Sequence, residues 1–271
     1  MSAFWTCMQS AGSRRMKARF EKLCVCLIVC AGMGAPAGCR TPSSEAGMTP
    51  EAPLKFHLAW APSVMREQAA LGREIGRALG EVSAFFGAAG YPVAPGDLIN
   101  TVVILEWTPE ARAGLAESFG MRSEDLLETL AGTVVERTLY LVVETRYRQI
   151  WESLYPDWPW EADTYHRLIV HELTHRAHEA VAMARLGSAD AMGPVWFFEG
   201  LAVMCAGQFD RGDPPMTEEE LAGHIGEART PAASYPLYGR LVRSLAARHP
   251  VGDLITRASQ PGFPYERSKD K

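Results

Sequence analysis

The spacing of apolar residues predicts the elements of this chain. From Ser63 to Gly87 they recur every three or four positions, as on one face of a helix. Two segments rich in β-branched residues, 100–107 and 133–144, are typical of strands. Short helices are predicted at 110–119 and 123–131, and helical spacing dominates after the second strand. Because the strands come early and the helices late, the pattern predicts the α+β class.

The first 39 residues have the pattern of an export signal. Basic residues precede an apolar run at 23–33, and small residues then lead to Cys39. The run is shorter than the roughly 20 residues that a membrane-spanning helix needs. The Ala-Gly-Cys sequence ending at Cys39 resembles a bacterial lipoprotein cleavage box, which implies an exported protein anchored to a membrane by a lipid and facing the periplasm or cell surface. Ordinary cleavage and a retained anchor are the alternatives, and Met16 is an alternative start to Met1.

Composition and charge limit the classes of partner. The chain has 271 residues, of which 47% are hydrophobic and 22% charged, as in ordinary globular proteins. Residues 1–39 hold five of the 27 basic residues and one of the 32 acidic ones, so the remainder is strongly acidic and a poor candidate for nucleic-acid binding. Five of the six cysteines also lie there, which leaves Cys205 without a partner for an intrachain disulfide. Residues 40–55 are predicted to form a flexible tether to a domain spanning 56–271.

A pair of histidines carries the first chemical signal. His171 and His175 are four residues apart, so on a helix their imidazoles lie on one face, one turn apart, where both can bind one Zn²⁺. An apolar stripe from Ile169 to Ala184 lies on the opposite side and is predicted to face the core. His178 lies about 10.5 Å along the axis from His171, too far to share the ion. His166 and His178 are therefore predicted to be groups behind the ligands or on the surface.

A single carboxylate in an apolar segment carries the second signal. Glu199 is the only ionisable carboxylate between residues 191 and 209, and apolar residues surround it at every helical neighbour. A segment that is apolar all round is predicted to be buried, and an unpaired buried carboxylate costs several kcal/mol. Zn²⁺ held by the two histidines is one candidate partner, and an Arg or Lys from elsewhere is the other. Gly200 is predicted to allow a second helix to approach closely.

These motifs resemble those of a known group of enzymes. His-Glu-x-x-His at 171–175, followed by Trp-x-x-Glu-Gly-x-Ala at 196–202, resembles the gluzincin zinc metallopeptidases of the peptidase MA-like clan, particularly aminopeptidase N-like and small bacterial members. The resemblance covers about residues 165–250. It implies a zincin-like domain with a small N-terminal mixed sheet, a peptide or protein substrate, and Glu172 as the general base of a metal-assisted hydrolysis. It also implies that one zinc ion is bound by His171, His175 and Glu199.

A tyrosine near a later helix is similar to another element of this group. The segment that begins at Tyr235 resembles the helix in which such enzymes place a tyrosine that hydrogen-bonds the tetrahedral intermediate. The spacing from Arg243 favours Tyr235, with Tyr238 as the alternative and a packing role as a third. Ser234 is predicted to cap this helix, and Pro236 suits its first turn.

Substrate specificity stays open at this point. The chain has no Gly-x-Met-Glu-Asn sequence, with which aminopeptidase N-like enzymes bind a free α-amine, and Glu144 is a weak substitute. Endopeptidase and aminopeptidase activity are both possible. The strand at 139–143 is predicted to align an extended peptide by edge pairing. An aromatic group at 151–160 is predicted to cover the core, or alternatively to form a substrate-contacting rim.

Two other classes of function compete with a peptidase. The first is a non-catalytic surface lipoprotein whose zinc-stabilised fold serves binding or assembly. The second is a metal-free helical binding domain. Zinc content and hydrolysis of casein or mixed peptides, with and without a chelator, separate the three.

Overall fold

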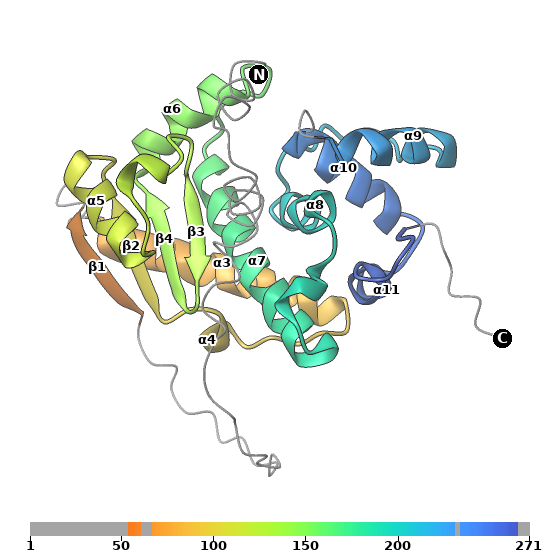
Figure 1. Cartoon of the computed structure of the whole chain (residues 1–271), viewed down its shortest axis with the longest axis horizontal. Coiled ribbons are helices and arrows are strands. Elements are labelled where there is room, and N and C mark those ends of the chain that lie inside the picture. The colour runs from red at the N-terminus through yellow and green to blue at the C-terminus, as the bar shows by residue number, and fades with distance from the viewer. Residues whose placement is uncertain (1–53, 61–66, 231–233, 265–271) are drawn as a thin grey trace, which may run out of the picture.

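The computed structural model describes residues 54–60, 67–230 and 234–264. They form one small mixed sheet and a larger set of helices, in agreement with the α+β class (Figure 1). The predicted export signal, Cys39 and nearly all of the tether lie outside the described residues. None of the described helices is long and apolar enough to cross a membrane.

The sheet has the strand order β1-β2-β4-β3. The first three are parallel, and β3 runs antiparallel to β4 at one edge. Lys55, the last residue of the predicted tether, already pairs with Thr101. The strands are β1 (Lys55–Trp60), β2 (Thr101–Leu105), β3 (Gly132–Val135) and β4 (Thr138–Val142).

The predicted single strand at 133–144 is wrong, because the chain forms a hairpin there. β3 and β4 pair through Val135 and Thr138 on either side of a two-residue turn. Glu136 in that turn has φ 54°, a left-handed conformation that L residues rarely adopt. Since β4 lies between β2 and β3, it has no open edge for a peptide, so edge pairing along 139–143 is also excluded.

The helices agree with the spacing of apolar residues in most places. One exception is the predicted helix at 123–131, where only the short 3-10 helix η2 (Ser123–Asp125) forms. The predicted helix at 63–87 is described from Gln68 onward. The remaining helices are α3 (Gln68–Ala88), α4 (Pro95–Leu98), α5 (Pro109–Ser118), α6 (Glu144–Leu154), α7 (Thr164–Leu186), η3 (Ala189–Met192), α8 (Val195–Cys205), α9 (Glu218–Ala228), α10 (Tyr235–Ala246) and α11 (Val251–Arg257).

Helices cover both faces of the sheet. Because side chains alternate along a strand, β2 sends Val102 and Ile104 to the main core, which α3 and α7 share. It sends Val103 and Leu105 to the opposite face, where α5 packs. Figure 1 shows α3 behind the sheet, α5 in front of it and α7 beside β3. Packing against the sheet thereby fixes the position of α7 relative to β3.

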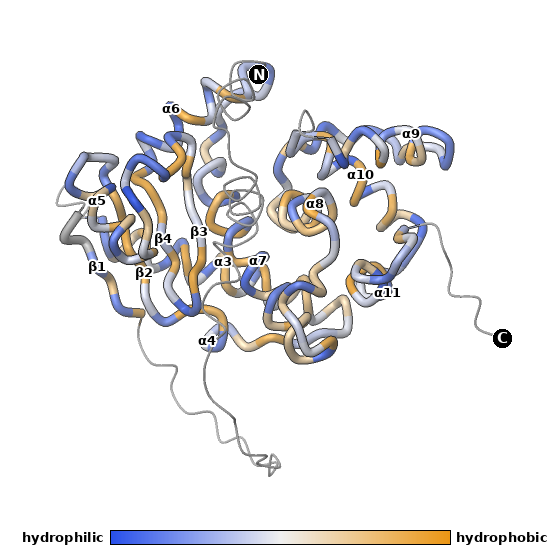
Figure 2. Tube along the Cα trace, viewed as in Figure 1, coloured by the Kyte–Doolittle hydropathy of each residue, from blue (hydrophilic) through white to orange (hydrophobic). Residues whose placement is uncertain are grey.

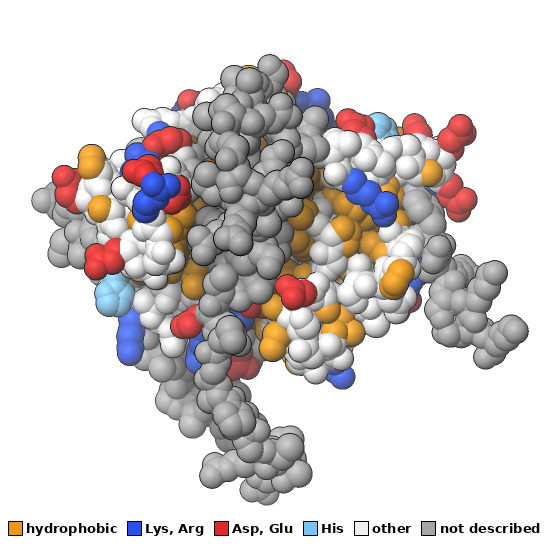
Figure 3. Space-filling view, viewed as in Figure 1, with side chains coloured by type: hydrophobic (Ala, Val, Ile, Leu, Met, Phe, Trp, Pro, Cys, Tyr) orange, Lys and Arg blue, Asp and Glu red, His pale blue; other side chains and the backbone are white. Residues whose placement is uncertain are grey.

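The C-terminal helices form the other half of the molecule. α8 is mostly apolar, with Glu199 as its one charged residue, and Trp196, Phe197 and Leu201 are almost fully buried (Figure 2). A Cβ atom on Gly200 would collide with the Tyr238 carbonyl of α10. The prediction that Gly200 permits a close helix approach is therefore confirmed. Acidic side chains gather over α9 on the outer surface (Figure 3).

The start of α10 follows the prediction in part. Ser234 is its N-cap residue and Pro236 lies in its first turn. Ser234 makes no side-chain hydrogen bond to the helix, however, so the predicted capping bond is wrong.

The aromatic group at 151–160 covers the core. Trp151 stacks on Phe209 with ring centroids 4.9 Å apart, and Tyr155 and Trp158 contact the same ring at 4.7 and 5.2 Å. Trp160 is partly buried against the core. These rings therefore hold the segment that follows α8.

Candidate metal centre

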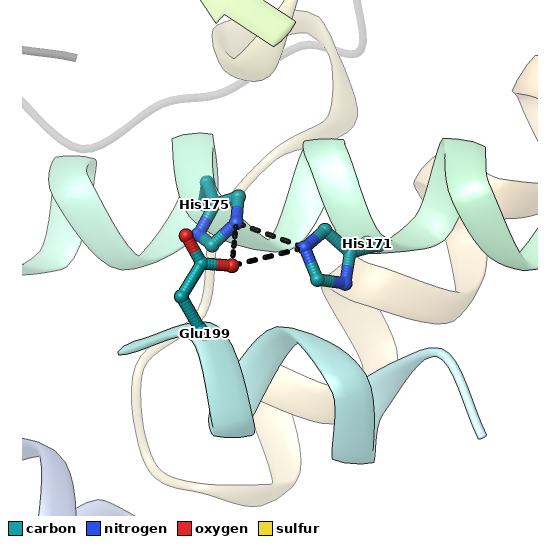
Figure 4. Close-up of side chains that lie close together, drawn as sticks. All are labelled: His171, His175 and Glu199. Atoms are coloured by element: carbon teal, nitrogen blue, oxygen red, sulfur yellow. Dashed lines mark hydrogen bonds and ion pairs between the residues drawn. The ribbon is translucent and has the colours of Figure 1, made fainter. Parts of the chain in front are cut away.

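The helix α7 positions the two histidines. Its apolar stripe is buried at Ile169, Leu173 and Ala177, as predicted, and the helix emerges to the surface by Ala184. Because this stripe fixes the rotation of the helix, the i and i+4 imidazoles point together toward α8 (Figure 4). The two Nε2 atoms lie 3.1 Å apart.

The helix α8 brings the carboxylate to the same point. The segment 187–194 contains η3 and connects α7 to α8. Glu199 projects from α8 toward α7, and its Oε2 lies 3.3 Å from the Nε2 atoms of both His171 and His175 (Figure 4). Glu199 thus meets two histidines that lie 24 and 28 positions before it in the sequence.

The spacing of these three atoms fits a metal ion. Ligands at about 2.0–2.1 Å from a tetrahedral zinc ion are roughly 3.3–3.4 Å apart, close to the observed distances of 3.1 and 3.3 Å. The Oε2 atom of Glu199 is buried without a hydrogen-bond partner in the described part of the chain. Among the described residues, this is the one group of three His, Cys, Asp or Glu side chains close enough to share an ion. The donor set of two imidazoles and one carboxylate suits zinc.

The electrostatics of the group favour a cation ligand. Burial by itself raises the pKa of Glu199, but the two histidines outweigh burial and lower this pKa to about 2. Burial lowers the pKa of His175, whereas Glu199 raises it, and the net change is upward. The carboxylate therefore stays ionised, in the form that binds a cation. No Arg or Lys pairs with Glu199 among the described ion pairs, so the two histidines are its charge partners.

Glu172 lies beside this group and against the edge strand. A Cβ atom added to Gly132 of β3 would lie 2.9 Å from the Cγ of Glu172, so the bare backbone of β3 leaves room for this side chain. Burial raises the pKa of Glu172; His171 and His175 oppose that effect, and the net change is upward. A carboxylate with a raised pKa is a better proton acceptor than an ordinary surface glutamate. Gly132 was not identified from the sequence.

Both predicted tyrosines lie on the side of α10 that approaches the site. Tyr235 is the first residue of α10, and its ring centroid lies 5.6 Å from that of His171. Tyr238 follows one turn later, and its ring centroid lies 6.2 Å from that of Tyr235. Burial and then Glu199 raise the pKa of Tyr238. Tyr235 is 37% exposed and therefore accessible to a bound molecule.

The other histidines do not join the group. His166 is buried, and its Nε2 lies 2.9 Å from the Oε2 of Glu81 on α3. His178 is 1% exposed, packs against Phe197, and has no hydrogen-bond partner among the described residues. A surface position for either histidine is therefore wrong. Glu144 is exposed at the start of α6 and lies outside the group.

One residue of the site escaped the sequence analysis. Gln208 is 4% exposed, and its Oε1 lies 2.9 Å from the Nδ1 of His171. The signal was an amide in an otherwise apolar segment, where a buried polar group needs a partner. Nothing in the spacing indicated which partner, because Gln208 lies beyond the end of α8.

The fold and the site define a class: an α+β protein with a candidate metal centre built from two histidines and one glutamate on facing helices. No family model matches the chain, and no curated protein or solved structure is significantly similar to it. The resemblance to gluzincins thus rests on the motifs at 171–175 and 196–202 and on the group that they form.

Proposed function

We propose that this protein is a zinc-dependent peptidase of the gluzincin type, with a zincin-like domain. The observation that carries the proposal is the convergence of His171, His175 and Glu199 at tetrahedral spacing, with Glu172 adjacent. Bound Zn²⁺ supplies Lewis-acid chemistry that polarises a carbonyl and lowers the pKa of water toward 7.

The remaining chemistry belongs to side chains of the chain itself. Glu172 accepts a proton from the attacking water and then donates it to the leaving amine. Burial raises the pKa of Glu172, which makes its carboxylate a better proton acceptor than an ordinary surface glutamate. The Tyr235 hydroxyl is the preferred donor to the oxyanion, since its ring is next to His171, and Tyr238 is the alternative.

The strand β3 is the proposed support for the substrate. It is one of the two edge strands of the described sheet, and Gly132 at its start adjoins Glu172. An extended peptide that adds to this edge passes next to the general base, and main-chain hydrogen bonds hold it largely independently of sequence. Cleavage of peptides with free and with blocked amino termini distinguishes aminopeptidase from endopeptidase activity.

The test is the substitution Glu172→Gln. It keeps the shape of the side chain but removes the proton acceptor, so we expect hydrolysis of casein and peptide libraries to fall by about 10²–10⁴-fold. Zinc content measured by elemental analysis stays near that of the wild type, because Glu172 is not a ligand. Glu152→Gln, at an exposed position of α6, is the matched control and retains full activity.

Three outcomes count against the proposal. Full activity in the Glu172→Gln variant contradicts the role of Glu172. A zinc-loaded wild type that cleaves no peptide supports a zinc-stabilised binding or assembly factor. A wild type that holds no zinc supports a metal-free binding domain.

A further inference from the structure

The two histidines of the metal centre are supported unequally. The Nδ1 of His171 lies 2.9 Å from the Oε1 of Gln208, whereas the Nδ1 of His175 is buried without a hydrogen-bond partner among the described residues. A neutral imidazole carries one proton, and the hydrogen bond made by one nitrogen decides which nitrogen is free to bind a metal. The orientation of Gln208 therefore bears directly on His171.

The backbone of Gln208 is held at both of its polar groups. The C-cap of α8 is Ala206, and the next residue, Gly207, has φ 61°. The Gly207 N–H donates to the Met204 carbonyl, and the Gln208 N–H donates to the Val203 carbonyl. The Gln208 carbonyl accepts a hydrogen bond from Arg243 of α10 at 3.2 Å. The backbone N–H and C=O groups of Gln208 are therefore both hydrogen-bonded, independently of its side chain.

The next residue is also held in an unusual conformation. Phe209 has φ 52°, a left-handed backbone that a bulky residue adopts only when its surroundings enforce it. Its carbonyl accepts from Arg243 at 2.7 Å, and its ring stacks on Trp151. Strained backbone held by several independent contacts is frequent at functional sites, and here it adjoins the residue that contacts His171.

We propose that Gln208 is a positioning residue that sets the tautomer of His171. Its amide oxygen accepts the Nδ1 proton, so the Nε2 lone pair points toward Glu199 and His175, where the metal ion is expected. Arg243 and the aromatic rings around Phe209 fix the turn that makes this contact. The presence of a metal ion at this point rests on the proposed function, whereas the tautomer of His171 does not depend on it.

The first readout needs no metal. In apo protein with ¹⁵N-labelled histidine, the wild-type His171 carries its proton on Nδ1, with the signal assigned by its loss in His171→Gln. In Gln208→Leu the acceptor is absent, so the Nε2-protonated form becomes populated. Gln68→Leu, at an exposed position of α3, leaves the spectrum of His171 unchanged.

The second readout is zinc affinity, measured by competition with a chromophoric chelator. Loss of a hydrogen bond behind a ligand typically weakens metal binding about 10–100-fold, which is the expected effect of Gln208→Leu. Gln208→Glu keeps an acceptor and retains zinc affinity close to that of the wild type. An equal loss in Gln208→Leu and Gln208→Glu shows that residue 208 acts through packing and overturns the proposal. Circular dichroism and melting temperature verify that each variant folds.

The outcomes separate this proposal from the proposed function. An unchanged His171 tautomer in Gln208→Leu, or unchanged zinc affinity, overturns the positioning role while peptidase activity still stands. The expected shifts in tautomer and affinity, found in a wild type that cleaves no peptide, support the positioning role and contradict the peptidase.

Discussion

At the residue scale, the absence of a side chain at position 132 is as important as the groups that are present. Gly132 is the first residue of β3 and lies against Glu172. A Cβ atom added to it would lie 2.9 Å from the Cγ of Glu172 and 3.1 Å from the Cδ2 of Leu141. Glu172 can move away from such a contact more easily than the strand can. Its position relative to the two imidazoles therefore depends on the glycine.

We expect Gly132→Ala to lower kcat by about 10–100-fold, because a displacement of about 1 Å at a catalytic group can cost as much as 10². Zinc content remains near that of the wild type, since no ligand moves. Steady-state kinetics and elemental analysis check both parts. Gly80→Ala, at an open helical position of α3, is the control. Equal kcat in both variants contradicts this role of Gly132.

The sequence predicted the three side chains of the candidate centre but not the residues that support them. His171 and His175 follow from helix geometry alone, and Glu199 was conspicuous as a charge in an apolar segment. Gln208 contacts His171 only because the chain turns after α8, and Gly132 meets Glu172 only because a hairpin forms. Both contacts depend on tertiary structure, which local periodicity does not encode.

At the element scale, the crossing of α8 and α10 determines where Glu199 lies. The two helices meet at Gly200, directly after Glu199, and at Gly239 of α10. A Cβ atom at Gly200 would meet the backbone of Tyr238, which cannot move cheaply, and one at Gly239 would meet the side chain of Val203 on α8. The crossing therefore sets the distance between the carboxylate and the tyrosines of α10.

We expect Gly200→Ala to lower the free energy of unfolding by about 1–3 kcal/mol, as overpacking at a close helix contact does. Gly223→Ala on α9, where an added Cβ meets nothing within 4 Å, should instead raise it by about 0.5–1 kcal/mol. Denaturant titration measures both. Stabilisation by both substitutions would show that α8 and α10 have room to separate.

The strands were harder to predict than the helices. Glu136 and Arg137 interrupt the β-branched residues at 133–144, but they did not indicate a turn, because Glu136 takes a left-handed conformation that glycine or asparagine usually occupies. The apolar residues at 123–131 resembled a helix, yet Leu126 packs instead into the small cluster below α5. Both errors arise where tertiary packing overrides local preference.

At the scale of the whole molecule, a neutral buried histidine makes folding depend on pH. Burial lowers the pKa of His178 to about 3, and nearby His175 adds to that effect. The ordinary value in the unfolded chain is about 6.5. Between these values the unfolded chain binds more protons, so stability rises with pH up to about 6.5 and then levels off.

We expect His178→Leu to remove part of this slope. Between pH 5 and 6.5, the wild-type free energy of unfolding should rise by about 1–2 kcal/mol more than that of the variant. Urea titrations in excess chelator measure this without a contribution from metal binding. His57→Leu, at an exposed position of β1, keeps the wild-type slope. Parallel slopes for wild type and His178→Leu would mean that His178 binds protons equally in the folded and unfolded states, which contradicts its lowered pKa.

The two helices that face each other across the candidate centre belong to different halves of the protein, since α7 packs on the sheet and α8 among the C-terminal helices. An ion shared between them is a removable cross-link that closes the intervening loop. Its contribution increases with the logarithm of free zinc once that concentration exceeds the dissociation constant. The stability of the folded chain would then depend on the zinc supply of its surroundings.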